Sequence, residues 1–212
     1  VLQKVLELSR PEDVIYEAIG HSYDKLHNYA QARFNYRKAT HLNQDNSQLF
    51  FKIAVTYMNE GIWESAVKNL ENALRLHRNH PEYNLAMGQC HMEMGSIEMA
   101  VQYFGNVLRT KPKNIYGWIE LLKCLYKTNC FEEGAEYVNH ALKMTGQKPI
   151  FFFYKSAFLL AMGKSKEAII QLENGMAKNP KLIKKLIDLN PSVLQNQLIV
   201  DVVAKFKRNK SI

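Results

Sequence analysis

The sequence lacks any apolar run long enough to cross a membrane. Its longest apolar segment, residues 150–163, is interrupted by Lys155. A spanning helix needs about 20 consecutive, mainly apolar residues. We therefore expect no membrane span.

Cysteine is also scarce, with only Cys90, Cys124 and Cys130. An odd, widely spaced set does not form a disulfide framework, and no Cys/His spacing predicts a zinc site. Cys90 and Cys124 lie 34 residues apart, and we expect both to be buried packing residues. Cys130 precedes a predicted helix and is a candidate exposed thiol.

Motifs for catalysis are missing. The chain has no Gly-rich phosphate loop, no GxSxG and no HExxH. His77 and His80 flank one junction without a Cys or carboxylate at ligand spacing, so we expect them to be solvated. We predict no enzyme activity, no metal and no cofactor for these 212 residues.

The sequence begins without Met and without a leader that has a cleavage site. Residues 1–12 fit the second helix of a preceding structural repeat, with Leu2 and Val5 at packing positions. We therefore expect the sequence to be cut from a longer array, and we predict no localisation.

The sequence does contain a period of 34 residues. One column is always small: Ala32, Ala66, Ala100, Gly134 and Ala168. A second is always large and apolar: Tyr36, Leu70, Phe104, Val138 and Leu172. A third is mostly Gly or Asn: His27, Gly61, Gly95, Asn129 and Gly163. The period predicts pairs of helices that cross at small residues, with a left-handed residue ending each first helix.

Each helix pair leaves an apolar edge that only a neighbouring pair can bury, which predicts a solenoid. The columns resemble the tetratricopeptide repeat (TPR), shown best by Met87, Gly88, Gly95, Phe104 and Pro112. The resemblance implies an all-α, right-handed α-solenoid of helix-turn-helix repeats at 13–46, 47–80, 81–114, 115–148 and 149–182. Three residues depart from the pattern: Asn84, Leu122 and Lys155.

After residue 182 the period ends. We expect residues 183–212 to form capping helices and a basic tail. A short helix is predicted up to Leu189, and a second helix begins at Pro191 with Asn190 as its N-cap. Its apolar stripe should cover the edge of repeat five: Val193, Leu194, Leu198, Val202 and Phe206.

The resemblance also implies a concave groove, lined by the fifth, ninth and twelfth residues of each repeat. In repeats one to three these are Glu17, His21, Asp24, Phe51, Val55, Met58, Leu85, Gln89 and Met92. In repeats four and five they are Ile119, Lys123, Tyr126, Phe153, Ala157 and Leu160. The groove is mainly apolar from Phe51 onward, which suits an amphipathic helix or an extended apolar peptide.

Several alternatives stay open for this groove. Its residues could instead be packed in the core, or the protein's own missing N-terminal part could fill it. Glu17 and His21 form either a ligand-facing pair or a simple surface pair. The clamp with which some TPR proteins hold a terminal carboxylate is not expected, because Glu17, Phe51, Glu82 and Ala86 stand at its positions.

The expected function is a non-catalytic scaffold that binds a protein or peptide of unknown identity. Two alternatives are a regulatory or substrate-recruiting segment of a larger enzyme, and a chaperone for a secreted or assembling partner. The net charge of +8 is concentrated at the C-terminal end, where residues 178–212 contain eight Lys or Arg against two Asp. Without aromatic interleaving or an RNA-reading motif, these lysines do not favour nucleic acid.

Overall fold

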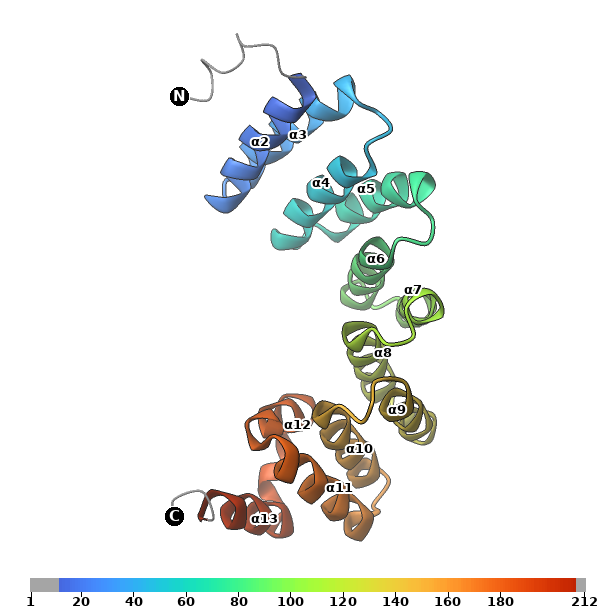
Figure 1. The fold of residues 1–212 in the computed structure, drawn as a ribbon, viewed down its shortest axis with the longest axis vertical. Coiled ribbons are helices and arrows are strands. Elements are labelled where there is room, and N and C mark those ends of the chain that lie inside the picture. Colours follow the sequence, from blue (N-terminus) through green and yellow to red (C-terminus); the bar gives the residue numbers. More distant parts are fainter. Residues whose placement is uncertain (1–11, 209–212) are drawn as a thin grey trace. The chain divides into compact units, whose positions relative to one another are not determined.

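The computed structural model describes residues 12–208, with side chains through residue 206, and every regular element among them is helical (Figure 1). The predicted all-α class is confirmed. The helix predicted for residues 1–12 falls almost entirely outside the described residues. The chain divides into two compact units, Val1–Thr110 and Lys111–Ile212.

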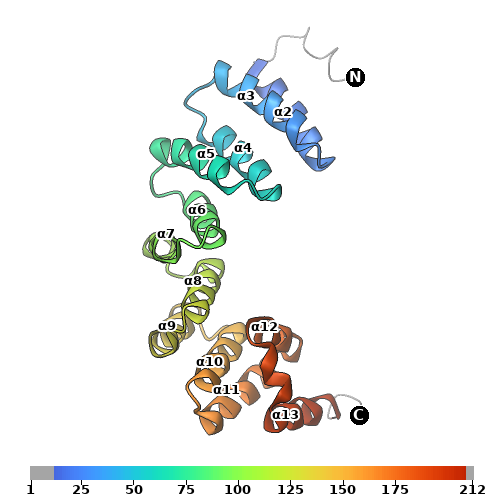
Figure 2. The ribbon, with the colours of Figure 1, turned by 180° about the vertical axis from the view of Figure 1, so that it is seen from behind.

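The first unit contains three helix pairs (Figures 1 and 2). They are α2 (Glu12–Lys25) with α3 (Tyr29–Leu42), α4 (Ser47–Asn59) with α5 (Trp63–Leu76), and α6 (Pro81–Glu93) with α7 (Ile97–Thr110). Asparagine is the N-cap of two of these helices, α3 and α4. Asn28 accepts a hydrogen bond from Gln31 N, and Asn46 accepts one from Gln48 N. These side chains satisfy N–H groups that a helix start leaves without a partner.

The second unit continues the pairs and then departs from them. It contains α8 (Ile115–Lys127) with α9 (Phe131–Met144), and α10 (Pro149–Ala161) with α11 (Ser165–Lys178). A short 3-10 helix, η1 (Pro180–Leu182), leads into α12 (Ile183–Leu189). The chain ends in a second 3-10 helix, η2 (Pro191–Gln195), and α13 (Gln197–Arg208).

The turn column has the predicted backbone at all five positions. His27, Gly61, Gly95, Asn129 and Gly163 have φ angles of 57°, 72°, 78°, 57° and 75°. A positive φ is unstrained for Gly and tolerated by Asn, and it ends a helix so that the chain can reverse. The prediction of a left-handed residue after each first helix is confirmed.

Aromatic rings fill the space that small residues leave at the helix crossings. A Cβ atom on Gly88 would lie 2.4 Å from Cε1 of Phe104, and one on Gly20 would lie 2.6 Å from Cδ1 of Tyr36. Phe104 and Tyr36 are fully buried. Gly20 and Gly88, on first helices, therefore interlock with residues of the large apolar column on the second helix of the same repeat.

One predicted helix is broken in the structure. The last helix does not run on from Pro191, because Asn196 separates η2 from α13 and accepts a hydrogen bond from Leu198 N at 3.1 Å. The break divides the predicted apolar stripe. Val193 and Val202 are buried, whereas Leu194 and Leu198 are more than half exposed.

Candidate functional site

Nine of the predicted groove residues lie in the first unit, on the first helix of each pair. Asp24, near the end of α2, is half-buried, and the other eight are treated together. We call them the first-helix face: Glu17, His21, Phe51, Val55, Met58, Leu85, Gln89 and Met92. The spacing 51, 55, 58 and 85, 89, 92 places the residues of α4 and α6 on one side of each helix. All eight are half-buried except His21, which is exposed.

Side-chain contacts connect the three helices that carry this face. The Glu17 carboxylate on α2 pairs with Lys52 Nζ on α4 at 2.5 Å, so its partner is Lys52 and not His21. The Phe51 ring on α4 lies 4.9 Å from the ring of Tyr83 on α6. Tyr83 donates a hydrogen bond to Gln48 Oε1 at 3.0 Å. Side-chain contacts therefore join α2 to α4 and α4 to α6 beside the first-helix face.

Two residues of the face also support the core. Phe51 and Met58 pack against the buried cluster that contains Leu70 and Met87. Phe51 is thus partly a packing residue, as one of the alternatives above proposed. Val55, Leu85 and Met92 stay half-buried.

The corresponding residues of the second unit lie in different surroundings. On α8, Ile119 is half-buried and Lys123 pairs with Glu120 at 2.9 Å. Tyr126, near the end of α8, packs against the rings of Phe131 and Phe158, both 5.4 Å away between centroids.

The C-terminal segment covers repeat five where an open groove was predicted. Phe153 and Ala157 on α10 are fully buried, in one cluster with Leu186, Val193 and Ile199 of the C-terminal segment. Tyr126 and Leu160 pack against the same cluster. Phe153 and Leu160 therefore do not face an open groove. In repeat five the C-terminal segment occupies this position. Filling of the remaining groove by a part of the protein before Val1 stays a prediction.

The sequence contained the signal for this cover. The apolar stripe of residues 193–206 predicts a cap on repeat five, and the structure adds Leu186 of α12 to that cap. In the structure, Leu186, Val193 and Val202 bury the inward residue Phe153 together with Leu172 and Met176 of α11.

Asn84, the departure in repeat three, is a buried polar residue with a defined role. Its amide donates to the carbonyl oxygens of Arg78 and His80 at 3.0 and 2.9 Å. It therefore provides a hydrogen-bond donor for two backbone carbonyl groups at the junction between α5 and α6. A hollow of about 390 Å³ lies beside Asn84 and is also lined by Arg78, Met87 and Tyr103.

The two histidines at this junction lie in different surroundings. His77 is exposed, as expected. The prediction for His80 is wrong, because its ring is half-buried and stacks on Tyr83 at 3.9 Å.

Two of the three cysteines are buried in the core, and the third is half-buried. Cys90 and Cys124 are fully buried, and burial raises the pKa of the Cys90 thiol to about 12 and that of Cys124 to about 11. Both are therefore protonated near neutral pH. Cys130 is half-buried and lies beside Thr128.

Within the described residues, no group of three or more His, Cys, Asp or Glu side chains could hold a metal ion. No helix between residues 12 and 208 is both long and apolar enough to cross a membrane.

The comparisons with known proteins agree with this fold. A family model described as tetratricopeptide repeat matches residues 14–46 and 81–114. A search of curated protein sequences gives no match.

Several solved structures are similar over most of the chain. The structure of YrrB, titled "a TPR protein with an unusual peptide-binding site", is 14% identical, with 95% of this chain and 96% of that chain covered and a TM-score of 0.66. The structure of MamA protein is 14% identical, with 88% and 96% covered and a TM-score of 0.67.

A third structure is the first TPR of Spaghetti (RPAP3) bound to the HSP90 peptide SRMEEVD. It is 21% identical, with 56% of this chain and 94% of that chain covered and a TM-score of 0.54. The family model matches two of the five repeats, and the described residues share the fold of these solved tetratricopeptide repeat structures.

Proposed function

We propose that this protein is a non-catalytic interaction scaffold that binds a peptide or amphipathic helix of another protein on the first-helix face. The observation that carries the proposal is the state of Val55, Leu85 and Met92, which are half-buried although Ala54, Ala86 and Cys90 on the same helices are fully buried.

The composition of the face suits such a ligand. Met and aromatic side chains make adaptable apolar contacts, and a helical ligand would present anchors at similar spacing. Each Å² of apolar surface removed from water contributes about 25 cal/mol before the costs of association. Glu17 and Gln89 would supply polar contacts that fix the orientation of the ligand.

The proposed site is smaller than the groove implied by sequence. Phe153 and Leu160 are excluded because the C-terminal segment covers them. Ile119 and Lys123 are kept as a separate candidate contact on the second unit. Two similar folds support peptide recognition in general terms: YrrB has a peptide-binding site by its title, and the RPAP3 repeat is bound to a peptide.

Two paired substitutions test the proposal. Val55→Glu with Met92→Glu adds two charges to the first-helix face, while Leu42→Glu with Met99→Glu adds the same charges at exposed apolar residues of second helices. We expect the first pair to reduce capture of partner proteins from native cells by roughly tenfold or more, because hot-spot contacts are lost. The control pair should retain capture.

Circular dichroism accompanies this comparison. Unfolding of the Val55/Met92 variant would mean that these residues are core, and an equal loss in both variants would mean that the face has no special role. Either result would contradict the proposal.

A further inference from the structure

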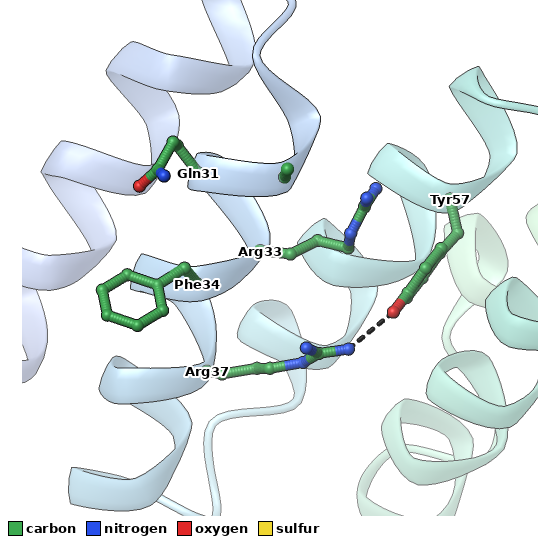
Figure 3. A pocket seen from close by; sticks show the side chains of 6 residues that line it. Gln31, Arg33, Phe34, Arg37 and Tyr57 are labelled. Carbon is green, nitrogen blue, oxygen red and sulfur yellow. Dashed lines mark hydrogen bonds between the residues drawn. The ribbon is translucent and has the colours of Figure 1, made fainter.

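A polar hollow of about 470 Å³ lies between the second helix of repeat one and the first helix of repeat two (Figure 3). Five of its lining residues belong to α3 and one belongs to α4. They are Ala30, Gln31, Arg33, Phe34, Arg37 and Tyr57.

Two arginines of this hollow converge on one tyrosine. The Arg33 guanidinium lies over the ring of Tyr57, 4.3 Å from its centroid, and also pairs with Glu60. Arg37 Nη2 donates a hydrogen bond to the Tyr57 hydroxyl at 2.5 Å. Because Glu60 pairs with Arg33, Arg37 is the guanidinium that remains for a ligand, and Lys38 Nζ lies nearby, 4.6 Å from the centroid of the Phe34 ring.

Arg37 and Tyr57 both retain hydrogen-bonding capacity. A guanidinium has five N–H donors, and a tyrosine hydroxyl that accepts one bond can still donate its own proton. Arg37 is exposed, and within residues 12–206 no carboxylate pairs with it. The hollow therefore presents several donors next to the exposed ring of Phe34.

The repeat pattern does not require these cations. The positions equivalent to Arg33 are Val67, Val101, Ala135 and Ile169. Those equivalent to Arg37 are Glu71, Gly105, Asn139 and Glu173. Helix α3 also contains Lys38 and has no Asp or Glu. Stacking in other repeats proceeds without a cation at either position, so repeat one has a property that packing alone does not explain.

We propose that this hollow binds a carboxylate from an acidic, aromatic-containing segment of a partner protein. Arg37 donates two N–H groups to the carboxylate, in the planar arrangement that suits arginine. The Tyr57 hydroxyl donates a further bond, and an apolar residue of the segment contacts Phe34. The site goes beyond the first-helix face, because α3 provides most of it, and it does not depend on binding there.

A protein ligand fits this site better than a nucleic acid. Nucleic-acid binding proteins neutralise several phosphates with a row of cations. Here Glu60 neutralises one of the two arginines. One available guanidinium, with Lys38 over the Phe34 ring beside it, matches a short acidic segment with an apolar neighbour.

The test uses a fluorescent peptide of sequence Glu-Glu-Phe-Glu-Glu, titrated into the 212-residue chain in low salt. Arg37→Gln removes the charge at the hollow, and Tyr57→Phe removes only the hydroxyl. Arg109→Gln, at an exposed residue of α7, is the matched charge control. We expect the Kd to rise about tenfold for Arg37→Gln, less for Tyr57→Phe, and under about twofold for Arg109→Gln.

Three results would overturn this proposal. An equal rise in Kd for Arg37→Gln and Arg109→Gln would mean that peptide binding depends only on the net charge of the protein. Complete competition by inorganic phosphate at the peptide's own concentration would assign the hollow to a small anion. Tighter binding of a single-stranded oligonucleotide, with the same dependence on Arg37, would assign it to nucleic acid. Arg37 is exposed, so circular dichroism should show that each Arg37 variant is folded.

Discussion

At the scale of single residues, close packing between glycine and aromatic rings determines how near two helices approach. Gly88 and Gly105 lie in adjacent helices but differ completely in their surroundings. A Cβ atom on Gly88 would overlap the Phe104 ring, whereas one on Gly105 would meet nothing within 4 Å.

This difference gives a matched prediction. Gly88→Ala should destabilise the protein by about 1–3 kcal/mol, because the buried Phe104 ring must move. Gly105→Ala should stabilise it by roughly 0.5–1 kcal/mol, because alanine is the better helix former. Urea unfolding of the two variants measures both values. Equal effects would mean that α6 and α7 do not interlock at this crossing.

The buried thiols give a prediction about pH. Burial raises the pKa of Cys90 and Cys124 from the ordinary 9.0 to about 12 and about 11. Because the folded pKa values are raised, these thiols stabilise the fold fully below about pH 9, and the contribution is lost as pH rises toward their folded values. The urea midpoint should therefore fall as pH increases above about 9.

The contribution of the thiols can be separated from that of other groups. Burial also raises the pKa of Tyr36 and Tyr154, so Cys90→Ala with Cys124→Ala should make the alkaline loss shallower without removing it. An unchanged pH slope in this variant would show that the two thiols are not desolvated as described.

At the scale of elements, the C-terminal segment closes the core of the second unit. Leu186 on α12 is buried against α10 and α11 in the cluster of Phe153, whereas Leu194 in η2 is more than half exposed. Both are leucines of the same short segment.

Substituting each by alanine tests whether the cover stabilises repeat five. Leu186→Ala should cost about 2–5 kcal/mol because it leaves a cavity in the core. Leu194→Ala should change stability by less than about 0.5 kcal/mol. Hydrogen exchange of α10 and α11 should accelerate only in the Leu186 variant. Similar exchange rates in both variants would show that the C-terminal segment does not stabilise α10 and α11.

The elements also show what sequence could and could not predict. The 34-residue columns predicted the helix pairs, the left-handed turns and the burial of Cys90, because each depends on local spacing. The burial of Phe153 and Ala157 under the C-terminal segment was not predictable in this way. The edge of repeat five and its inward residues are both apolar, so covering either one would bury similar side chains.

Departures from the columns were more informative than agreement with them. Asn84 departs from its column, and the structure gives it buried hydrogen bonds and an adjoining hollow. Arg33 and Arg37 also depart from their columns, but only the placement of Tyr57 and Glu60 revealed the hollow. Side-chain placement across a helix junction is not encoded in the period.

At the scale of the whole molecule, the TPR fold leaves partner recognition to surfaces that stacking does not use. In repeat arrays each unit interacts mainly with its neighbours, so a surface residue can change without altering the remaining repeats. The proposed scaffold therefore depends on the half-buried residues Val55, Leu85 and Met92 of the first unit.

Site-specific photo-cross-linking tests this central claim most directly. A benzophenone side chain would be placed at Val55 or Met92, and at Leu42 or Met99 as exposed controls, before irradiation in native extract. The account predicts that the same partner segment is cross-linked from Val55 and Met92 and not from the controls. Equal cross-linking at all four residues, or none at Val55 and Met92, would contradict it.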